Sequence, residues 1–184
     1  MERSAAPKAK VVEPDVIVIG AGVAGLYQLH RLRGLGLRVQ VFEAGTGVGG
    51  TWYWNRYPGA RFDSESWTYG YSFSEELLQE WEWPEHFAAQ PDTLRYLNYV
   101  ADKFDLRRDI RFGCRVVTAR FDEAGDRWTI TLENGEQASA RLLITALGPL
   151  SAYTLPNIPG RESFQGQAFH TARWRHDVDL AGKR

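Results

Sequence analysis

One stretch, residues 16–43, constrains the fold of this chain more than any other. The run V-I-V-I at residues 16–19 is continuous, apolar and β-branched, as expected of a parallel strand buried on both faces. The pattern G-x-G-x-x-G follows at once, with its glycines at Gly20, Gly22 and Gly25. A helix with an apolar face comes next and ends at two glycines, and a strand at 38–42 then leads to Glu43. This order predicts a βαβ unit that binds a dinucleotide, with a plain βαβ unit as the alternative.

Each glycine has a separate role in such a unit. Gly20 permits the tight turn, Gly22 lets a pyrophosphate approach the backbone, and Gly25 lets helix and strand pack closely. The unpaired N–H groups and positive dipole end of the helix would face the phosphates. Glu43 would accept hydrogen bonds from the adenosine ribose, which favours FAD or NAD over the 2′-phosphate of NADP. The motif alone leaves FAD and NAD open.

Composition and charge exclude several classes of protein. The 184 residues are 43% hydrophobic and 24% charged, which is ordinary for a soluble globular protein. The net charge of −1 gives no reason to expect nucleic acid or an anionic membrane as a partner. No apolar run approaches the roughly 20 residues needed to cross a bilayer, and residues 1–14 lack the apolar centre of a signal peptide. We therefore expect a cytoplasmic protein.

Cysteine and histidine usage gives no sign of a metal site. The one cysteine, Cys114, excludes an internal disulfide and fits a reducing compartment. We interpret it as a structural residue rather than a nucleophile. The four histidines are scattered along the chain, so we expect no metal.

A glycine-rich loop and an aromatic-rich stretch follow Glu43. Residues 44–52 form the loop, either a flexible connector or, because it follows a strand at the carboxyl edge of the sheet, part of a ligand site. Residues 53–63 place large aromatic side chains among Arg56, Arg61 and Asp63. This composition predicts the wall of a pocket for a flat ring system.

The rest of the chain predicts helices, then strands. One helix is capped by Ser74 and stopped at Pro84; the next is capped by Asp92 or Thr93 and has an apolar face. Three strands follow at about 115–121, 127–132 and 137–141, with a hairpin turn at Asn134 and Gly135 between the last two. A buried strand is expected at 142–146. Residues 1–13 are expected to be a flexible tail, and the Pro- and Gly-punctuated residues after 149 a linker.

This order of elements resembles the FAD domain of the glutathione-reductase-like flavoproteins. The resemblance implies an α/β fold, a Rossmann FAD-binding domain with a three-stranded β-meander, of which residues 14–149 would be the N-terminal part. Residues 142–148 would be the return strand and its glycine turn. Leu147 departs from the small residue that the family usually has there.

Two longer motifs resemble those of type I Baeyer–Villiger monooxygenases. Residues 49–63 read G-G-x-W-x-x-x-x-Y-P-G-x-x-x-D and match every specified position of the second fingerprint. Residues 164–174 read F-x-G-x-x-x-H-x-x-x-W and are similar to the main fingerprint, although Arg175 stands where the family has Pro or Asp. N-hydroxylating and dimethylaniline-type flavin monooxygenases carry Tyr or Phe in place of Trp174. Residues 52–104 are especially similar to the phenylacetone, steroid and cyclopentadecanone subgroup.

The resemblance implies a role for each matching residue. The FAD pyrophosphate would lie on Gly20, Gly22 and Gly25, the adenosine ribose on Glu43, and the adenine against the backbone of Val116. Gly50, Thr51 and Trp52 would line the flavin with Trp54 nearby, and Asp63 and Tyr69 fall on flavin-site positions. Arg61 would lie where NADPH approaches. His170 and Trp174 would belong to a hinge between domains, or be packed linker residues.

The resemblance also implies the reaction. In this family NADPH reduces the flavin, O₂ adds to give a C4a-peroxyflavin, and oxygen is inserted beside the carbonyl of a ketone to give an ester or lactone. Asp63 would orient and tune an arginine near the peroxide, or would only accept hydrogen bonds from glycine-loop amides. That arginine and a second G-x-G-x-x-G would belong to C-terminal domains missing from these residues, with 150–184 leading to the NADPH domain. We therefore expect the 184-residue chain alone to be inactive.

Two alternatives stay open from the sequence. The chain could be a non-catalytic, truncated flavin-binding module that never meets the missing domains. It could also derive from an N-hydroxylating or dimethylaniline-type flavin monooxygenase. An in-frame G-x-G-x-x-G soon after residue 184 would favour the complete oxygenase.

Overall fold

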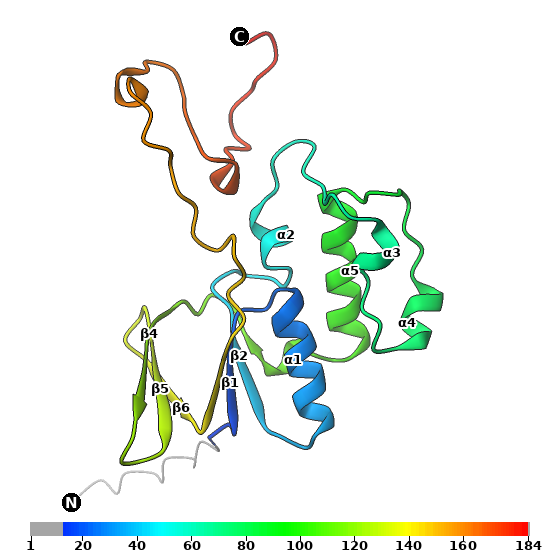
Figure 1. The fold of residues 1–184 in the computed structure, drawn as a ribbon, viewed down its shortest axis with the longest axis vertical. Coiled ribbons are helices and arrows are strands. Elements are labelled where there is room, and N and C mark those ends of the chain that lie inside the picture. Colours follow the sequence, from blue (N-terminus) through cyan, green and yellow to red (C-terminus); the bar gives the residue numbers. More distant parts are fainter. Residues whose placement is uncertain (1–12, 184) are drawn as a thin grey trace, which may run out of the picture.

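The computed structural model describes residues 13–183, so the expected tail at 1–13 lies, except for Glu13, outside the described residues. Two β-sheets pack against each other, and the helices cover the opposite face of the larger sheet (Figure 1). None of the helices within these residues has the length and hydropathy that a membrane span requires.

The larger sheet is parallel and is built around β1 (Val16–Ile19). Its neighbours are β2 (Val39–Phe42) on one side and β7 (Leu142–Thr145) on the other, with Val16 opposite both Val39 and Leu142. A two-residue strand, β3 (Ile110–Arg111), extends the sheet beyond β2, giving the order β3-β2-β1-β7. The crossover from β1 to β2 is α1 (Val23–Gly34), which confirms the predicted βαβ unit.

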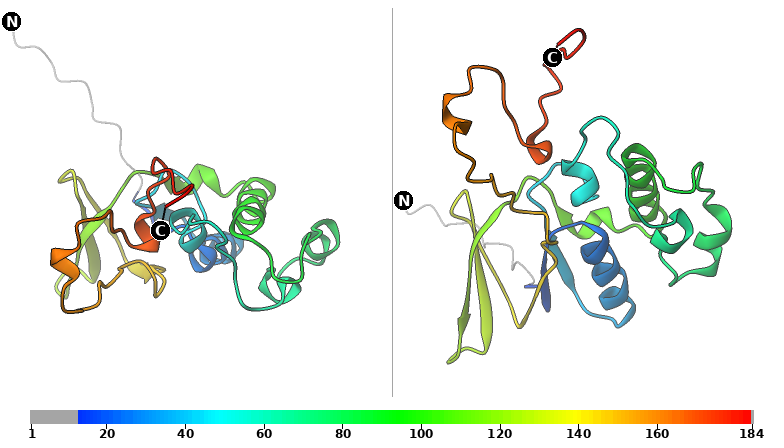
Figure 2. Two further views of the ribbon diagram at one scale, coloured as in Figure 1. Left: turned by 90° about the horizontal axis from the view of Figure 1, so that it is seen from above. Right: turned by 45° about the horizontal axis from the view of Figure 1, so that its top comes forward.

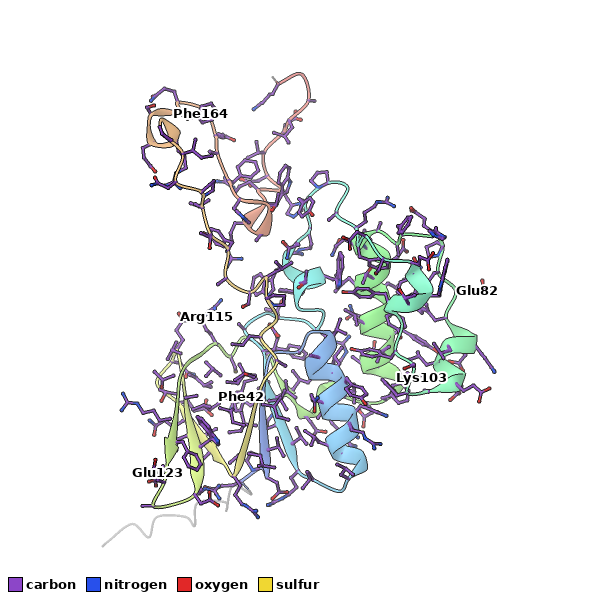
Figure 3. The ribbon with its side chains drawn as sticks, in the orientation of Figure 1. Phe42, Glu82, Lys103, Arg115, Glu123 and Phe164 are labelled. Carbon is purple, nitrogen blue, oxygen red and sulfur yellow. The ribbon has the colours of Figure 1, made fainter. Side chains whose placement is uncertain are left out.

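The smaller sheet is the predicted meander of β4 (Val116–Asp122), β5 (Arg127–Leu132) and β6 (Gln137–Ala140). Gly135 has φ +85° in the turn between the last two strands, as the Asn-Gly pair predicts. A buried cluster joins the two sheets: Ile17 and Phe42 from the parallel sheet contact Ile130, Leu132 and Ala140. Phe42 is labelled at this junction in Figure 3.

The helical side contains α4 (Glu75–Glu80), α5 (Gln90–Lys103) and two one-turn helices, α2 (Thr51–Trp54) and α3 (Ser66–Tyr69). The Ser74 cap is confirmed, because its Oγ accepts a hydrogen bond from the Leu77 amide. The expectation that Asp92 or Thr93 caps α5 is wrong: the cap residue is Ala89. Pro91 lies in the first turn, where its missing N–H costs nothing, and the helix therefore begins earlier.

Other expectations also need correction. The first of these helices ends at Glu80 rather than at Pro84, because Trp81 turns to an extended conformation. The strand predicted to be buried, β7, is half-exposed, with 50% of Leu142 accessible, because it is the edge strand of its sheet. α2, α3, β3 and the 3₁₀ turn η1 (Arg107–Asp109) are too short to leave a periodic pattern in the sequence.

Residues 150–183 leave the sheets as a long, mostly exposed segment (Figures 1 and 2). Its local structure consists of two 3₁₀ turns, η2 (Arg161–Ser163) and η3 (Thr171–Arg173). Phe164, in the outer part of the segment, is 62% exposed (Figure 3). The chain then turns back toward the sheets, so that η3 lies near α2 (Figures 1 and 2).

Gly25 is the position at which α1 and β1 approach most closely, and it gives the first prediction. A Cβ there would lie 1.9 Å from the Gly20 carbonyl oxygen, so Gly25→Ala must push helix and strand apart. We expect it to lower the free energy of unfolding by about 3 kcal/mol.

Gly34→Ala is the matched control for this change, because a Cβ at Gly34 meets nothing within 4 Å. It should leave stability unchanged or raise it by up to about 1 kcal/mol. Urea unfolding followed by tryptophan fluorescence measures both variants. Equal stabilities would contradict the packing role of Gly25.

Candidate cofactor site

A pocket lies at the carboxyl ends of β1, β2 and β7, and encloses about 820 Å³ of empty space that includes its open mouth. Residues that directly follow the three strands form its base: Gly20 after β1, Glu43 after β2, and Ala146 after β7. Its walls come from α2, the start of β4 and η3. Ligands of parallel α/β sheets bind at this edge.

The N-terminus of α1 opens into the pocket. Gly22 is the N-cap residue, no side chain caps the helix, and its first turn contains no acidic residue. Gly20 and Gly22 both line the cavity. The free N–H groups and the positive dipole end of a 12-residue helix therefore favour an anionic group here.

Two glycine turns touch at the base of the pocket. Gly50 has φ +53°, and a Cβ added to it would lie 2.8 Å from the Gly22 Cα. One residue earlier, the Gly49 amide donates to the Ala21 carbonyl oxygen at 3.0 Å. A side chain at position 50 would separate the two turns, so this contact requires glycine.

Glu43 is buried, and its carboxylate joins the turn after β1 to the start of the loop after β2. Oε2 accepts a hydrogen bond from the Ala21 amide and Oε1 one from the Gly45 amide, both at 2.7 Å. Each oxygen retains a further lone pair, and the residue lines the pocket. Glu43 can thus hold the turns in place and still accept a hydrogen bond from a ligand hydroxyl.

Tyr53 covers the loop that follows Glu43. Its ring faces Gly45 and Gly47, where an added Cβ would lie 2.7 and 3.3 Å from ring carbons. Its hydroxyl is hydrogen-bonded to the Thr46 hydroxyl at 2.7 Å and accepts a hydrogen bond from the Thr46 amide at 3.1 Å. These two hydrogen bonds lower the pKa of Tyr53 below its ordinary value. The loop is therefore fixed, not a flexible connector.

Trp52 and Tyr69 belong to an aromatic cluster outside the pocket lining. The indole N–H of buried Trp52 donates to the Tyr69 hydroxyl at 2.7 Å. The Tyr69 ring stacks on the Phe62 ring, with 4.3 Å between the ring centres. Burial raises the pKa of Tyr69. In a one-turn helix, residues 52 and 54 cannot share a face, so Trp52 points inward while Trp54 lines the pocket.

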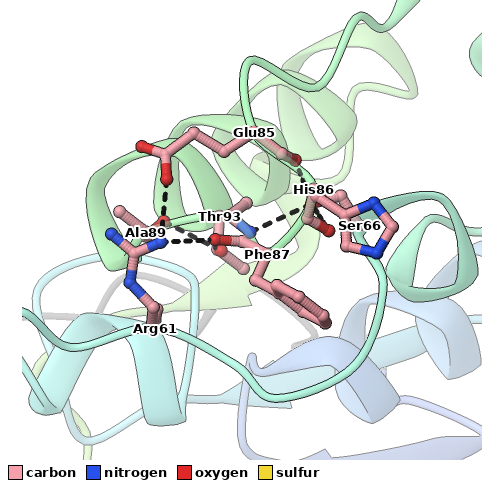
Figure 4. Close-up of polar contacts among 8 residues, drawn as sticks. Arg61, Ser66, Glu85, His86, Phe87, Ala89 and Thr93 are labelled. Carbon is pink, nitrogen blue, oxygen red and sulfur yellow. Dashed lines mark hydrogen bonds and ion pairs between the residues drawn. The ribbon is translucent and has the colours of Figure 1, made fainter.

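Arg61 and Asp63 also lie outside the pocket lining. Arg61 donates to the Glu85 carboxylate and to the Phe87 carbonyl oxygen, both at 2.8 Å, and so ties two loops together (Figure 4). Ser66 Oγ joins the same network by donating to the Glu85 carbonyl oxygen at 2.6 Å. Asp63 is exposed, and within residues 13–183 no hydrogen bond or ion pair reaches its carboxylate, including any from glycine-loop amides.

The structure brings together most of the residues expected to hold the cofactor. Those that line the pocket are Gly20, Gly22, Glu43, Gly50, Thr51, Trp54 and Val116. Those that do not are Gly25, Trp52, Arg61, Asp63 and Tyr69. Leu147, the departure from the family pattern, is at the pocket with an exposed side chain.

Sequence reasoning missed several residues of the lining, among them Asn55, Cys114, Arg115 and Arg173. Asn55 directly follows Trp54, so its position could have been inferred from its neighbour. Cys114 and Arg115 precede Val116 at the start of β4, where Arg115 is labelled in Figure 3. Arg173 occupies an unspecified position of the 164–174 motif, and nothing in the sequence marked it.

Replacement of the Glu43 carboxylate gives the second prediction. In Glu43→Gln the new NH₂ group would face a backbone N–H, so one buried amide loses its acceptor. We expect the free energy of unfolding to fall by about 1–3 kcal/mol. The exposed Glu133→Gln is the control and should change nothing measurable in the same urea titration. Equal stability of the two variants would show that Glu43 does not hold the turns.

Comparisons with known proteins agree with this geometry. Residues 18–79 match the family described as NAD(P)-binding Rossmann-like domain. The chain is 53% identical to an acetone monooxygenase (methyl acetate-forming) from Gordonia sp. (strain TY-5), over 92% of this chain and 32% of that protein. It is 50% identical to a phenazine N-monooxygenase from Lysobacter antibioticus, again over 92% and 32%. A crystal structure of an OTEMO complex with FAD and NADP matches with a TM-score of 0.86 and 49% identity, over 95% of this chain and 34% of that one.

The chain thus spans about a third of the length of these relatives. Several of the homologues that are 45–57% identical are Baeyer–Villiger monooxygenases, and the match falls in their N-terminal third. The two glycine turns and the pocket occur in the part of the chain that these matches cover. By sequence and by fold, the chain is therefore similar to the N-terminal third of Baeyer–Villiger monooxygenases.

Proposed function

We propose that residues 14–149 bind FAD as part of an NADPH- and O₂-dependent monooxygenase that inserts oxygen beside a ketone carbonyl. The main support for this proposal is the uncapped N-terminus of α1, which opens into a pocket whose base also contains the Glu43 carboxylate. The match to a FAD- and NADP-bound relative supports the choice of FAD.

The residues of the pocket fit an ADP-bearing cofactor. Gly20 and Gly22 leave room for a diphosphate beside free N–H groups, and Glu43 retains lone pairs for ribose hydroxyls. Val116 would contact the adenine through its backbone. Gly50, Thr51 and Trp54 would line the flavin side, where Trp54 offers an apolar surface. When bound, FAD would supply the reduction and oxygen chemistry, and the protein would position it and exclude water.

The other predicted residues would act from outside this pocket. Asp63 is exposed and free of protein partners within residues 13–183, which leaves its carboxylate available to an arginine from a further domain. Trp52 and Tyr69 would support the flavin side from behind α2. Arg61 would meet NADPH only at the outer surface, beside Glu85.

The complete activity would require partners beyond this chain: NADPH, O₂, a ketone and further domains of the same protein, to which residues 150–184 would lead. The sequence contains only one G-x-G-x-x-G followed by a strand and an acid. We also propose a cytoplasmic location. Oxygenation at nitrogen is a second candidate, because the phenazine N-monooxygenase is 50% identical to this chain.

FAD binding by the chain is the third prediction. FAD should bind with quenching of its fluorescence, whereas FMN, which lacks the AMP part, should not. Gly22→Val should weaken FAD binding at least about tenfold by filling the diphosphate site, and Gly34→Ala should bind like the wild type. Urea unfolding of both variants shows that they are folded. Equal affinities for FAD and FMN would contradict the assignment.

The fourth prediction is that the chain alone does not oxygenate ketones. It spans a third of its relatives and its pocket is open to solvent, so a reactive flavin would be exposed to water. The test incubates the chain with FAD, NADPH and a panel of cyclic and aryl ketones, and detects esters by mass spectrometry. Ester above a free-flavin control would show that these residues assemble a complete site.

A further inference from the structure

The segment that carries the 164–174 motif returns to the pocket after an exposed excursion. Ala172 is buried and lines the pocket together with Arg173. His170 caps the short turn η3, with Nδ1 accepting a hydrogen bond from the Ala172 amide at 3.0 Å. This turn forms one wall of the pocket, although the residues from 150 to 168 that lead to it are exposed.

Arg173 makes cation–π contacts with two aromatic rings. Its guanidinium carbon is 5.5 Å from the centre of the Trp54 ring and 5.2 Å from the centre of the Tyr153 ring. Nη1 donates to the Ala172 carbonyl oxygen at 2.9 Å, and within residues 13–183 no carboxylate pairs with the side chain. The neighbouring Arg175 is instead paired with Asp177, which holds the pKa of that aspartate at about 2.

These two contacts connect three separate parts of the chain. Trp54 belongs to α2 and lines the pocket, while Tyr153 follows β7 and stacks on His170 at 4.8 Å. Arg173 therefore joins the wall of the pocket to the segment that leaves the sheet and to the motif that returns. A planar guanidinium suits this place, because it can stack on both rings at once.

We propose that Arg173 is a positioning residue that clamps residues 169–174 onto α2 and so closes one side of the cofactor pocket. The nature of the ligand rests on the proposed function, but the clamp itself is a contact within the free protein. A ligand enclosed by this wall would leave more slowly while the clamp is formed. By linkage, a bound ligand would in turn hold the clamp closed.

Amide hydrogen exchange tests the clamp without any ligand, and this is the fifth prediction. In Arg173→Ala, amides of residues 168–175 should exchange faster than in the wild type, while those of β1 and α1 should be unchanged. Arg173→Lys, which keeps the charge but not the planar group, should lie between. Arg175→Ala is the matched control and should exchange like the wild type. An Arg173→Ala protein indistinguishable from Arg175→Ala would overturn the proposal.

FAD dissociation from the same chains gives the second measurement. Arg173→Ala should release FAD about 5 to 30 times faster, the factor that corresponds to two exposed cation–π contacts. Tyr153→Leu should have part of this effect, and the double variant should show less than the sum of the two changes. Additive changes would show that Arg173 and Tyr153 do not act through a shared contact. Failure of the wild type to bind FAD would reject the proposed function, whereas the exchange experiment would still decide the clamp.

Discussion

Two backbone amides, one in the turn after β1 and one in the loop after β2, converge on the buried carboxylate of Glu43. The rest of the pocket depends on this interaction, because it fixes the turn after β1 and the loop after β2 in one arrangement. Gly22 and Gly50 can then touch at the base of the pocket, and the uncapped first turn of α1 lies beside them. Charged hydrogen bonds of this kind are stronger than neutral ones, so a carboxylate suits the position better than an amide. The acid expected to serve a ribose is thus also a structural link within the protein.

Much of the fold could be predicted because it follows local rules. The βαβ unit is encoded by a β-branched run and three spaced glycines, and the meander by alternation around Asn134 and Gly135. The start of α5 was misplaced because Pro91 is compatible with a first turn, and sequence alone does not decide between adjacent caps. The exposure of β7 depends on its place at the edge of the sheet, which no property of its four residues encodes.

The pocket residues could be predicted where the backbone forms the pocket. They were harder to predict where the direction of a side chain decides whether it lines the pocket. Gly20 and Gly22 had to lie at the pocket because they follow β1 and the carboxyl ends of the strands meet at one edge. Trp52 and Trp54 are alike in the sequence, but a hydrogen bond to Tyr69 turns the first into the core and leaves the second for the pocket. Arg173 could not be predicted from the sequence because its partner Trp54 is more than one hundred residues away in the chain. Only the fold brings the two side chains together.

The edge position of β7 also affects the shape of the pocket. Among residues 13–183, no strand pairs with the outer side of β7, so its backbone N–H and C=O groups there could pair with a further strand. A parallel strand added there would place its carboxyl end next to Ala146 and Leu147, which already line the cavity. The edge of the sheet at β7 is therefore also one edge of the pocket. A polypeptide that extended the sheet at this edge would therefore also add to the wall of the pocket.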